Sequence, residues 1–141
     1  MRFLLDTNIV SDLVRHPRGT ISDRIAEVGE EHVCTSIIVA AELHFGATRK
    51  NSSRLTAQLE AVLGAIDVLP LEAPVDAVNG AIRARLERTG RPIGANNLLI
   101  AAHALTLGRA VVTDNEREFL QIDDLRVEKL AKVTMIVQPR H

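Results

Sequence analysis

The sequence predicts an α/β fold with three layers, α/β/α, around a central and mainly parallel β-sheet. Short apolar runs typical of buried strands are each followed by turn formers and then by a longer segment with helical spacing of apolar residues. This alternation of strand and helix continues through most of the chain, and such alternation builds parallel sheets. Two of the short runs end in a triplet that contains Asp and Asn, at the strand end where open parallel sheets bind ligands.

The first strand, at 3–5, ends at the triplet Asp6-Thr7-Asn8. Asp, Thr and Asn cap helix N-termini well, and the apolar residues that follow have helical spacing. Asp6 is therefore expected between a strand and a helix. A carboxylate at this point either only caps the helix or belongs to a site, and other acids at the same edge would favour a site.

Turn and cap residues divide the rest of the chain. Ser36 and Pro74 are suited to begin helices, Gly46 is expected to end one, and Gly108 stands just past the end of another. The expected helices lie at 9–14, 20–30, 37–45, 51–64, 74–88, 97–107 and, as a single turn, 116–120. The other expected strands lie at 32–35, 66–69, 110–112, 126–127 and 133–137.

Composition limits the class of protein. A chain of 141 residues with 46% apolar and 25% charged residues is expected to form one domain over 1–141, with a tail at 131–141 that we leave unassigned. No signal peptide or membrane-spanning apolar run is present, so a cytoplasmic protein is expected, without a membrane partner. The single cysteine, Cys34, excludes an intrachain disulfide and a zinc site built from thiolates.

Acids and amides gather where ligands are expected. The second triplet, Thr113-Asp114-Asn115, also follows a strand, Glu42 lies inside an apolar helix, and Asn96-Asn97 stand at a helix start. Carboxylates without clustered His or Cys suit a hard cation such as Mg²⁺ or Mn²⁺, which binds phosphate oxygens and activates water. Taken singly, Glu42 could be a solvated helix residue and the second triplet a simple turn.

Two other folds that bind ligands at strand ends fit less well. A phosphate-receiver domain needs a lysine at a late strand end, and none of the three lysines stands there. A phosphatase built on Asp-x-Asp needs an acid where this chain has Asn8. A glycine fingerprint for a nucleotide is also missing.

The motifs resemble those of PIN-domain ribonucleases, and more closely those of VapC-type toxins from bacterial toxin–antitoxin pairs. The matching stretches, in the family's order, are LLDTN at 4–8, AAELHFGA at 40–47, IGANNLLIAAHAL at 93–105, VVTDNEREF at 111–119 and LRVE at 125–128. The resemblance implies a PIN-like fold and endonucleolytic cleavage of RNA with Mg²⁺ or Mn²⁺. It places the catalytic positions at Asp6, Glu42, Asn97, Thr113, Asp114 and Asn115, all of which except Thr113 would be metal ligands.

The main departure from the family is Asn97, which stands where the family has its third acid. Asn matches Asp in shape but is neutral and offers one oxygen, so metal binding and activity should be weakened. The change is either an introduced or selected inactivation or a natural property of a weakened relative. The fourth acidic position falls on Asn115, where the family varies, and Asp114 or Glu118 could supply charge.

The resemblance also implies partners. They are a structured RNA such as a tRNA, a VapB-like antitoxin whose tail lies in an apolar groove, and a second copy of the chain in a homodimer. Arginines at 83, 85, 88 and 91 could contact RNA phosphates or form a solvated helix face. The alternative function is a non-catalytic PIN-like module that binds RNA or a protein, and a DNA nuclease with the same site is a further rival.

Overall fold

The computed structural model describes residues 2–129 and contains a five-stranded parallel sheet with the strand order β3-β2-β1-β4-β5. The strands are β1 (Phe3–Leu5), β2 (Val33–Ser36), β3 (Asp67–Leu69), β4 (Ala110–Val112) and β5 (Val127–Glu128). The expected strand at 133–137 and the tail at 131–141 lie outside the described residues.

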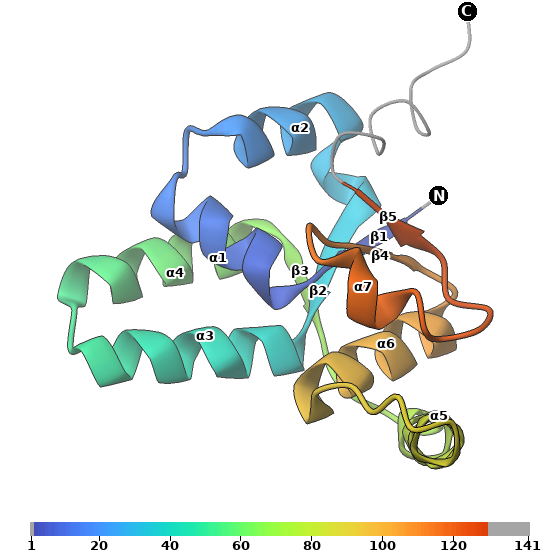
Figure 1. Cartoon of the computed structure of the whole chain (residues 1–141). Coiled ribbons are helices and arrows are strands. Elements are labelled where there is room, and N and C mark those ends of the chain that lie inside the picture. The colour runs from blue at the N-terminus through green and yellow to red at the C-terminus, as the bar shows by residue number, and fades with distance from the viewer. Residues whose placement is uncertain (1, 130–141) are drawn as a thin grey trace, which may run out of the picture.

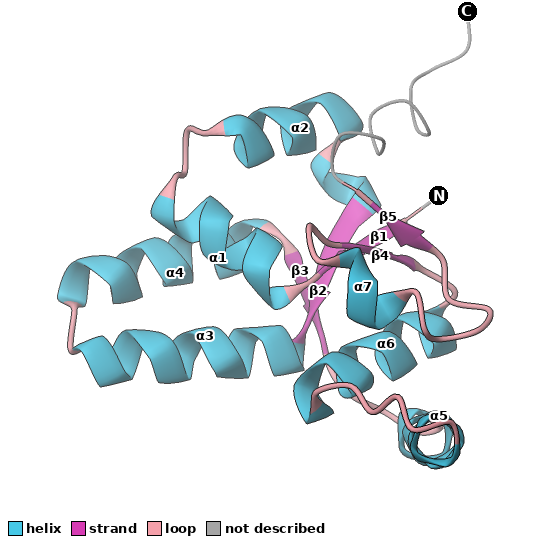
Figure 2. Ribbon diagram, viewed as in Figure 1, coloured by secondary structure: helices cyan, strands magenta, loops and turns pink. Residues whose placement is uncertain are grey.

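Helices cover both faces of this sheet (Figures 1 and 2). They are α1 (Thr7–Arg15), α2 (Thr20–Val28), the 3₁₀ turn η1 (Glu30–His32), α3 (Ile37–Lys50), α4 (Ser53–Ala65), α5 (Val75–Arg88), α6 (Ala95–Leu107) and α7 (Glu116–Phe119). Figure 1 shows α1 to α4 on one side of the strands and α5 and α6 on the other. The predicted three-layer α/β/α architecture is confirmed. Over the described residues, no helix combines the length and hydropathy needed to span a membrane.

Several helix boundaries differ from the prediction, among them those of the helices that carry Glu42 and Asn97. Helix α3 continues through Gly46 to Lys50 and is capped by Asn51, which adopts a left-handed conformation with φ of 51°. A glycine inside a helix costs only about 1 kcal/mol, and burial of Val39 and Ala47 on the same helix outweighs that cost. Helix α6 begins at Ala95, two residues before the expected start.

The register of the central strands fixes where the site lies. Strand β1 is fully buried between β2 and β4, and Leu5 is aligned with Thr35 on one side and Val112 on the other. Because these strands are parallel, the residues that follow them emerge at one edge of the sheet. The backbone amide of Asp6 donates to the carbonyl of Val112 over 3.1 Å, which joins the two strand ends that carry the acidic triplets.

Candidate active site

Asp6 lies at the end of β1 and is almost fully buried, with 3% of its surface exposed. Its Oδ1 accepts a hydrogen bond from the backbone amide of Ile9 over 3.0 Å, so it caps helix α1 as the sequence allowed. Burial raises the pKa of the Asp6 carboxyl, against hydrogen bonds from Thr113 and Ile9 that lower it, and the nearby charge of Asp114 raises it further. Asp6 is thus a buried carboxyl group that is repelled by the charge of Asp114, and a bound cation would stabilise its ionised form.

Glu42 is held against the same strand end. The hydroxyl of Thr7, the residue after Asp6, donates a hydrogen bond to Oε1 of Glu42 over 2.9 Å. Helix α3 packs on α1, and Glu42 on α3 is half-buried. Glu42 is therefore not a freely solvated helix residue. Its carboxylate is held in a defined position by Thr7, the residue that follows Asp6.

The second triplet reaches the site mainly through Thr113. This residue is fully buried, its hydroxyl hydrogen-bonds Asp6, and its Oγ1 accepts from the backbone amide of Asn115 over 2.9 Å. Asp114 and Asn115 are exposed. Asp114 interacts with Asp6 by charge, whereas the backbone of Asn115 is what holds the turn.

Asn97 lies in the first turn of α6, and its side-chain amide donates to the carboxylate of Glu118 on α7. The other oxygen of Glu118 accepts from the backbone amide of Gly94 over 3.0 Å. From the sequence, Glu118 is expected only as an alternative source of charge. The structure makes it the direct partner of Asn97, on the helical turn that follows the second triplet.

The predicted residues thus form two bonded groups. The first contains Asp6, Glu42 and Thr113: Thr113 hydrogen-bonds Asp6, and Glu42 accepts from Thr7, the residue after Asp6. Asp114 interacts with Asp6 by charge alone, and Asn97 and Glu118 form the second group. The segment from Thr113 to Glu118 connects them along the chain, and Asn115 lies on it.

The candidate ligands are of the type that a divalent cation prefers, but few of them are carboxylates that lie close together. In the described part of the chain, no three His, Cys, Asp or Glu side chains lie close enough together to hold a metal ion. All the available donors are oxygens, and Mg²⁺ characteristically uses one or two carboxylates together with waters and substrate phosphates. Asp6 and Glu42 meet that requirement, and Asn97 stands at the position where the resemblance implies a third acid.

Ser36, which the sequence indicated as a helix cap, makes two hydrogen bonds near this edge of the sheet. Its Oγ accepts from the backbone amide of Ile38 over 3.1 Å and lies 2.8 Å from Nδ1 of His103. His103 is buried in α6, with 1% of its surface exposed. The pair therefore joins α3, which carries Glu42, to α6, which carries Asn97.

The arginines near Asn97 are distributed over the surface of α5 and the following loop. Arg83 pairs with Glu87 over 3.2 Å, and Arg85 pairs with Asp123 over 3.6 Å. Arg88 and Arg91 are exposed. Their expected contact with RNA phosphates stays a prediction.

Comparison with known proteins identifies the family. The PIN domain family matches residues 3–125. The tRNA(fMet)-specific endonuclease VapC of Shigella flexneri is 35% identical over 129 residues, which are 91% of this chain and 97% of that protein. Ribonuclease VapC2 of Haemophilus influenzae is 35% identical over 130 residues, with the same shares covered.

Solved structures agree. The crystal structure of VapBC2 from Rickettsia felis bound to a promoter DNA fragment contains a chain that matches with a TM-score of 0.85 and 29% identity, over 92% of this chain and 98% of that chain. DNA-bound VapBC from Salmonella typhimurium matches with a TM-score of 0.81 and 33% identity over the same shares. The chain therefore belongs to the PIN domain family and, within it, to the VapC ribonucleases.

Proposed function

We propose that this chain is the toxin ribonuclease of a toxin–antitoxin pair and hydrolyses phosphodiester bonds in RNA with the help of Mg²⁺ or Mn²⁺. The observation that carries the proposal is the buried carboxylate of Asp6, which Thr7 and Thr113 join to Glu42 and the second triplet at one edge of the sheet. The similarity to VapC ribonucleases over 91% of the chain supports it. We place this activity in the cytoplasm.

The chain's own residues prepare the site. Asp6 and Glu42 would hold the cation, which when bound lowers the pKa of water and stabilises charge on phosphate oxygens. Asp6 is fixed by Ile9 and Thr113, and Glu42 by Thr7, so both carboxylates are oriented before substrate arrives. Burial of Asp6 excludes bulk water and strengthens its interaction with any cation.

Asn97 is expected to weaken this site. Its amide nitrogen is committed to Glu118, and only one neutral oxygen remains to interact with a cation. The chain should therefore bind the cation less tightly than a variant with aspartate at 97, and cleave more slowly. Asp114 and Asn115 are proposed as the remaining ligands on the exposed side of the site.

The proposed substrate is a structured RNA, and a tRNA in particular. One relative that is 35% identical is named for specific cleavage of tRNA(fMet). Only three Phe and no Trp or Tyr occur in this chain, so a platform of stacked bases is not available and the shape of the RNA should contribute to recognition.

An antitoxin is the proposed protein partner. The structural relatives from Rickettsia felis and Salmonella typhimurium are VapBC complexes. A groove of about 390 Å³ between α2 and α4 has mainly apolar walls, which include Leu13, Ile25, Ala61 and Val62. We propose that an apolar segment of a VapB-like antitoxin lies in this groove.

A homodimer is proposed on a different face. Helix α3 exposes two large apolar side chains, Phe45 by 65% and Ile37 by 44%. Burial of this face against a second copy would remove it from water. Multi-angle light scattering of the wild type and a Phe45→Ser variant tests this, and a monomeric wild type would refute it.

The second candidate function is a non-catalytic module that binds RNA or a protein. The neutral Asn97, together with the lack of a three-acid cluster in the part of the chain that the structure describes, is the observation that favours it. Such a module would keep the fold and the binding surfaces without cleaving.

One assay separates the two functions. Total tRNA is incubated with Mg²⁺ or Mn²⁺ and the Asn97→Asp variant, and with the same variant that also carries Glu42→Gln. The ribonuclease proposal expects discrete fragments that require the metal, vanish with chelator and are lost in the double variant. Intact tRNA with a folded Asn97→Asp variant would refute it and favour the binding module.

A further inference from the structure

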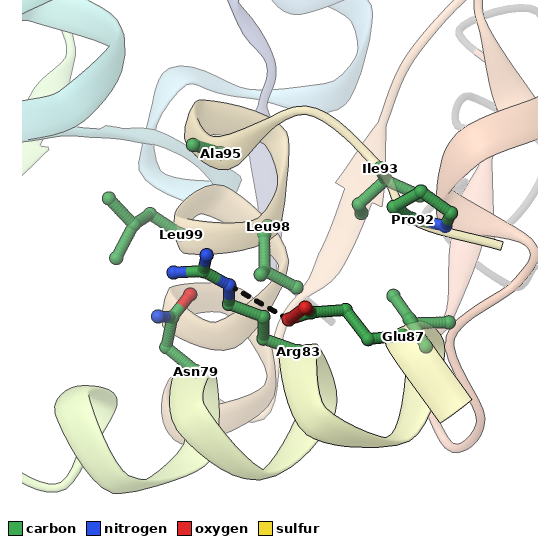
Figure 3. Close-up of a pocket in the computed structure, with 9 residues that line it drawn as sticks. Asn79, Arg83, Glu87, Pro92, Ile93, Ala95, Leu98 and Leu99 are labelled. Atoms are coloured by element: carbon green, nitrogen blue, oxygen red, sulfur yellow. Dashed lines mark hydrogen bonds and ion pairs between the residues drawn. The ribbon is translucent and has the colours of Figure 1, made fainter. Parts of the chain in front are cut away.

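A pocket of about 560 Å³ lies between α5 and α6 (Figure 3). Asn79, Arg83 and Glu87 form one wall, and their spacing of four residues places them along one face of α5. Figure 3 shows these three side chains projecting toward α6. The pocket therefore has one wall whose side chains can donate and accept hydrogen bonds.

The facing wall is apolar. Leu98 and Leu99 from the first turns of α6, and Pro92 from the loop before it, line this side (Figure 3). Flat apolar surfaces suit the faces of a nucleobase, while the polar side chains of α5 suit its edge. The volume is within the range of small-ligand sites, which is roughly 300–1,000 Å³.

The pocket and the candidate active site share the first turn of α6. Ala95 and Leu98, which line it, lie on either side of Asn97 in the first turn of α6. A nucleotide beside the bond that is cut could therefore place its base in the pocket while its phosphate lies at the acidic edge.

The polar wall has unused hydrogen-bonding capacity. Oδ1 of Asn79 is buried and has no hydrogen-bond partner among the described residues. Arg83 and Glu87 are paired with each other over 3.2 Å, but their side chains are 69% and 59% exposed, so a ligand can reach them. Exposed pairs of this kind are weak and exchange partners easily.

We propose that this pocket is a subsite for a guanine base of the RNA substrate, and this inference rests on the proposed ribonuclease function. The Glu87 carboxylate accepts hydrogen bonds from N1–H and the N2 amino group of guanine, and the Arg83 guanidinium donates to O6. Adenine offers only one amino group on the corresponding edge, with an acceptor at N1 that would face the carboxylate. Glu87 and Arg83 together therefore select guanine over adenine.

The test measures nucleotide binding directly and needs neither metal nor cleavage. The full wild-type chain, labelled with ¹³C and ¹⁵N, is titrated with GMP, AMP, CMP and UMP while the methyl signals of Leu98 and Leu99 and the side-chain amide of Asn79 are followed. GMP is expected to shift these signals with saturation and to bind about tenfold or more tightly than AMP. All four probes carry the same phosphate, so the difference reports the base.

Variants locate the interaction. Glu87→Gln keeps the size of the side chain but removes the carboxylate, and Arg83→Gln removes the guanidinium. Both are expected to weaken GMP binding by about tenfold and to reduce the preference over AMP. Arg54→Gln, an exposed arginine on α4 away from this pocket, is the matched control and should bind GMP as the wild type does.

Two results would overturn the subsite. One is the absence of saturable GMP shifts at Asn79, Leu98 and Leu99, and the other is equal GMP affinity in the wild type and Glu87→Gln. Failure of the proposed ribonuclease would show instead as intact tRNA in the cleavage assay. The two failures are thus read from separate experiments.

Discussion

The side-chain amide of Asn97 donates a hydrogen bond to the carboxylate of Glu118. The same carboxylate accepts from the backbone of Gly94, so it holds the loop that begins α6. The amide at 97 therefore stabilises a contact that an aspartate at this position would turn into a contact between two negative charges. Asn97 suits the metal-free protein, whereas aspartate would suit a site that contains a cation.

The first prediction concerns stability without metal. In EDTA, Asn97→Asp should lower the free energy of unfolding by about 1–3 kcal/mol, because it removes the hydrogen-bond donor to one oxygen of Glu118 and adds repulsion between two carboxylates. Added Mn²⁺ should recover much of the loss, since a ligand that binds only the folded state stabilises it. Thermal unfolding measures both effects. Asn96→Asp adds the same charge at an exposed neighbour, and an equal loss in that control would contradict the explanation.

The second prediction concerns Asp6. Burial raises the pKa of this carboxyl above 3.8, so ionisation destabilises the folded state, and this cost appears as pH rises through the folded-state pKa. Asp6→Asn keeps the cap on Ile9 and removes the charge, so its Tm at neutral pH should exceed that of the wild type in EDTA. The same variant should abolish cleavage in the Asn97→Asp background.

A metal titration provides the control for Asp6. Excess Mg²⁺ should raise the Tm of the wild type but not that of Asp6→Asn, so the difference between them shrinks. A variant that is less stable than the wild type in EDTA at pH 7 would show that burial of the Asp6 charge is not a cost to the fold.

The third prediction follows from His103. Burial lowers the pKa of this imidazole below 6.5, although a hydrogen bond with the backbone of Pro70 raises it in part. The unfolded chain therefore binds a proton that the folded chain does not. The free energy of unfolding should therefore be fully retained above pH 6.5 and should fall as the pH drops below that value. Urea denaturation at a series of pH values from about 7.5 to 5.5 measures this change.

An NMR titration assigns this effect to its residue. The imidazole of His103 should titrate at a lower pH in the folded chain than in the urea-unfolded chain. If the ring titrates at the same pH in both states, the hydrogen bond between Ser36 and a neutral His103 is not what joins α3 to α6.

The fourth prediction tests the antitoxin groove. Ala61 is exposed on α4 and lines the groove, so Ala61→Arg should fold normally and fill the space with a charged side chain. Capture of a co-expressed VapB-like antitoxin should fall by about tenfold or more. Ala84→Arg, at an exposed position of α5, should capture it as the wild type does. Equal capture by both variants would place the antitoxin elsewhere.

Local patterns were sufficient to predict most of the elements and the members of the first bonded group. Asp6 follows a strand and precedes a helix, and Glu42 interrupts an apolar helix face, so both are visible in the sequence. The continuation of α3 through Gly46 was not predicted, because packing of Val39 and Ala47 outweighs the local preference of glycine.

Contacts between distant segments were not predictable in the same way. Glu118 and Asn97 are 21 residues apart, and Ser36 and His103 are 67 apart. Nothing in their local sequence identifies the partner, since only the packing of α6 against α7 and α3 brings them together. The pocket beside α5 was missed for the same reason, and Arg83 was interpreted only as a phosphate contact or as part of a solvated helix face.

The measurement that tests the central claim most directly is the single-turnover rate of tRNA cleavage with Mn²⁺ by the wild type, Asn97→Asp and Asn96→Asp. If Asp6 and Glu42 form a metal-assisted ribonuclease site that Asn97 weakens, Asn97→Asp should cleave at least about tenfold faster than the wild type, and Asn96→Asp should not. Equal rates for all three proteins, or no cleavage by any of them, would contradict this account.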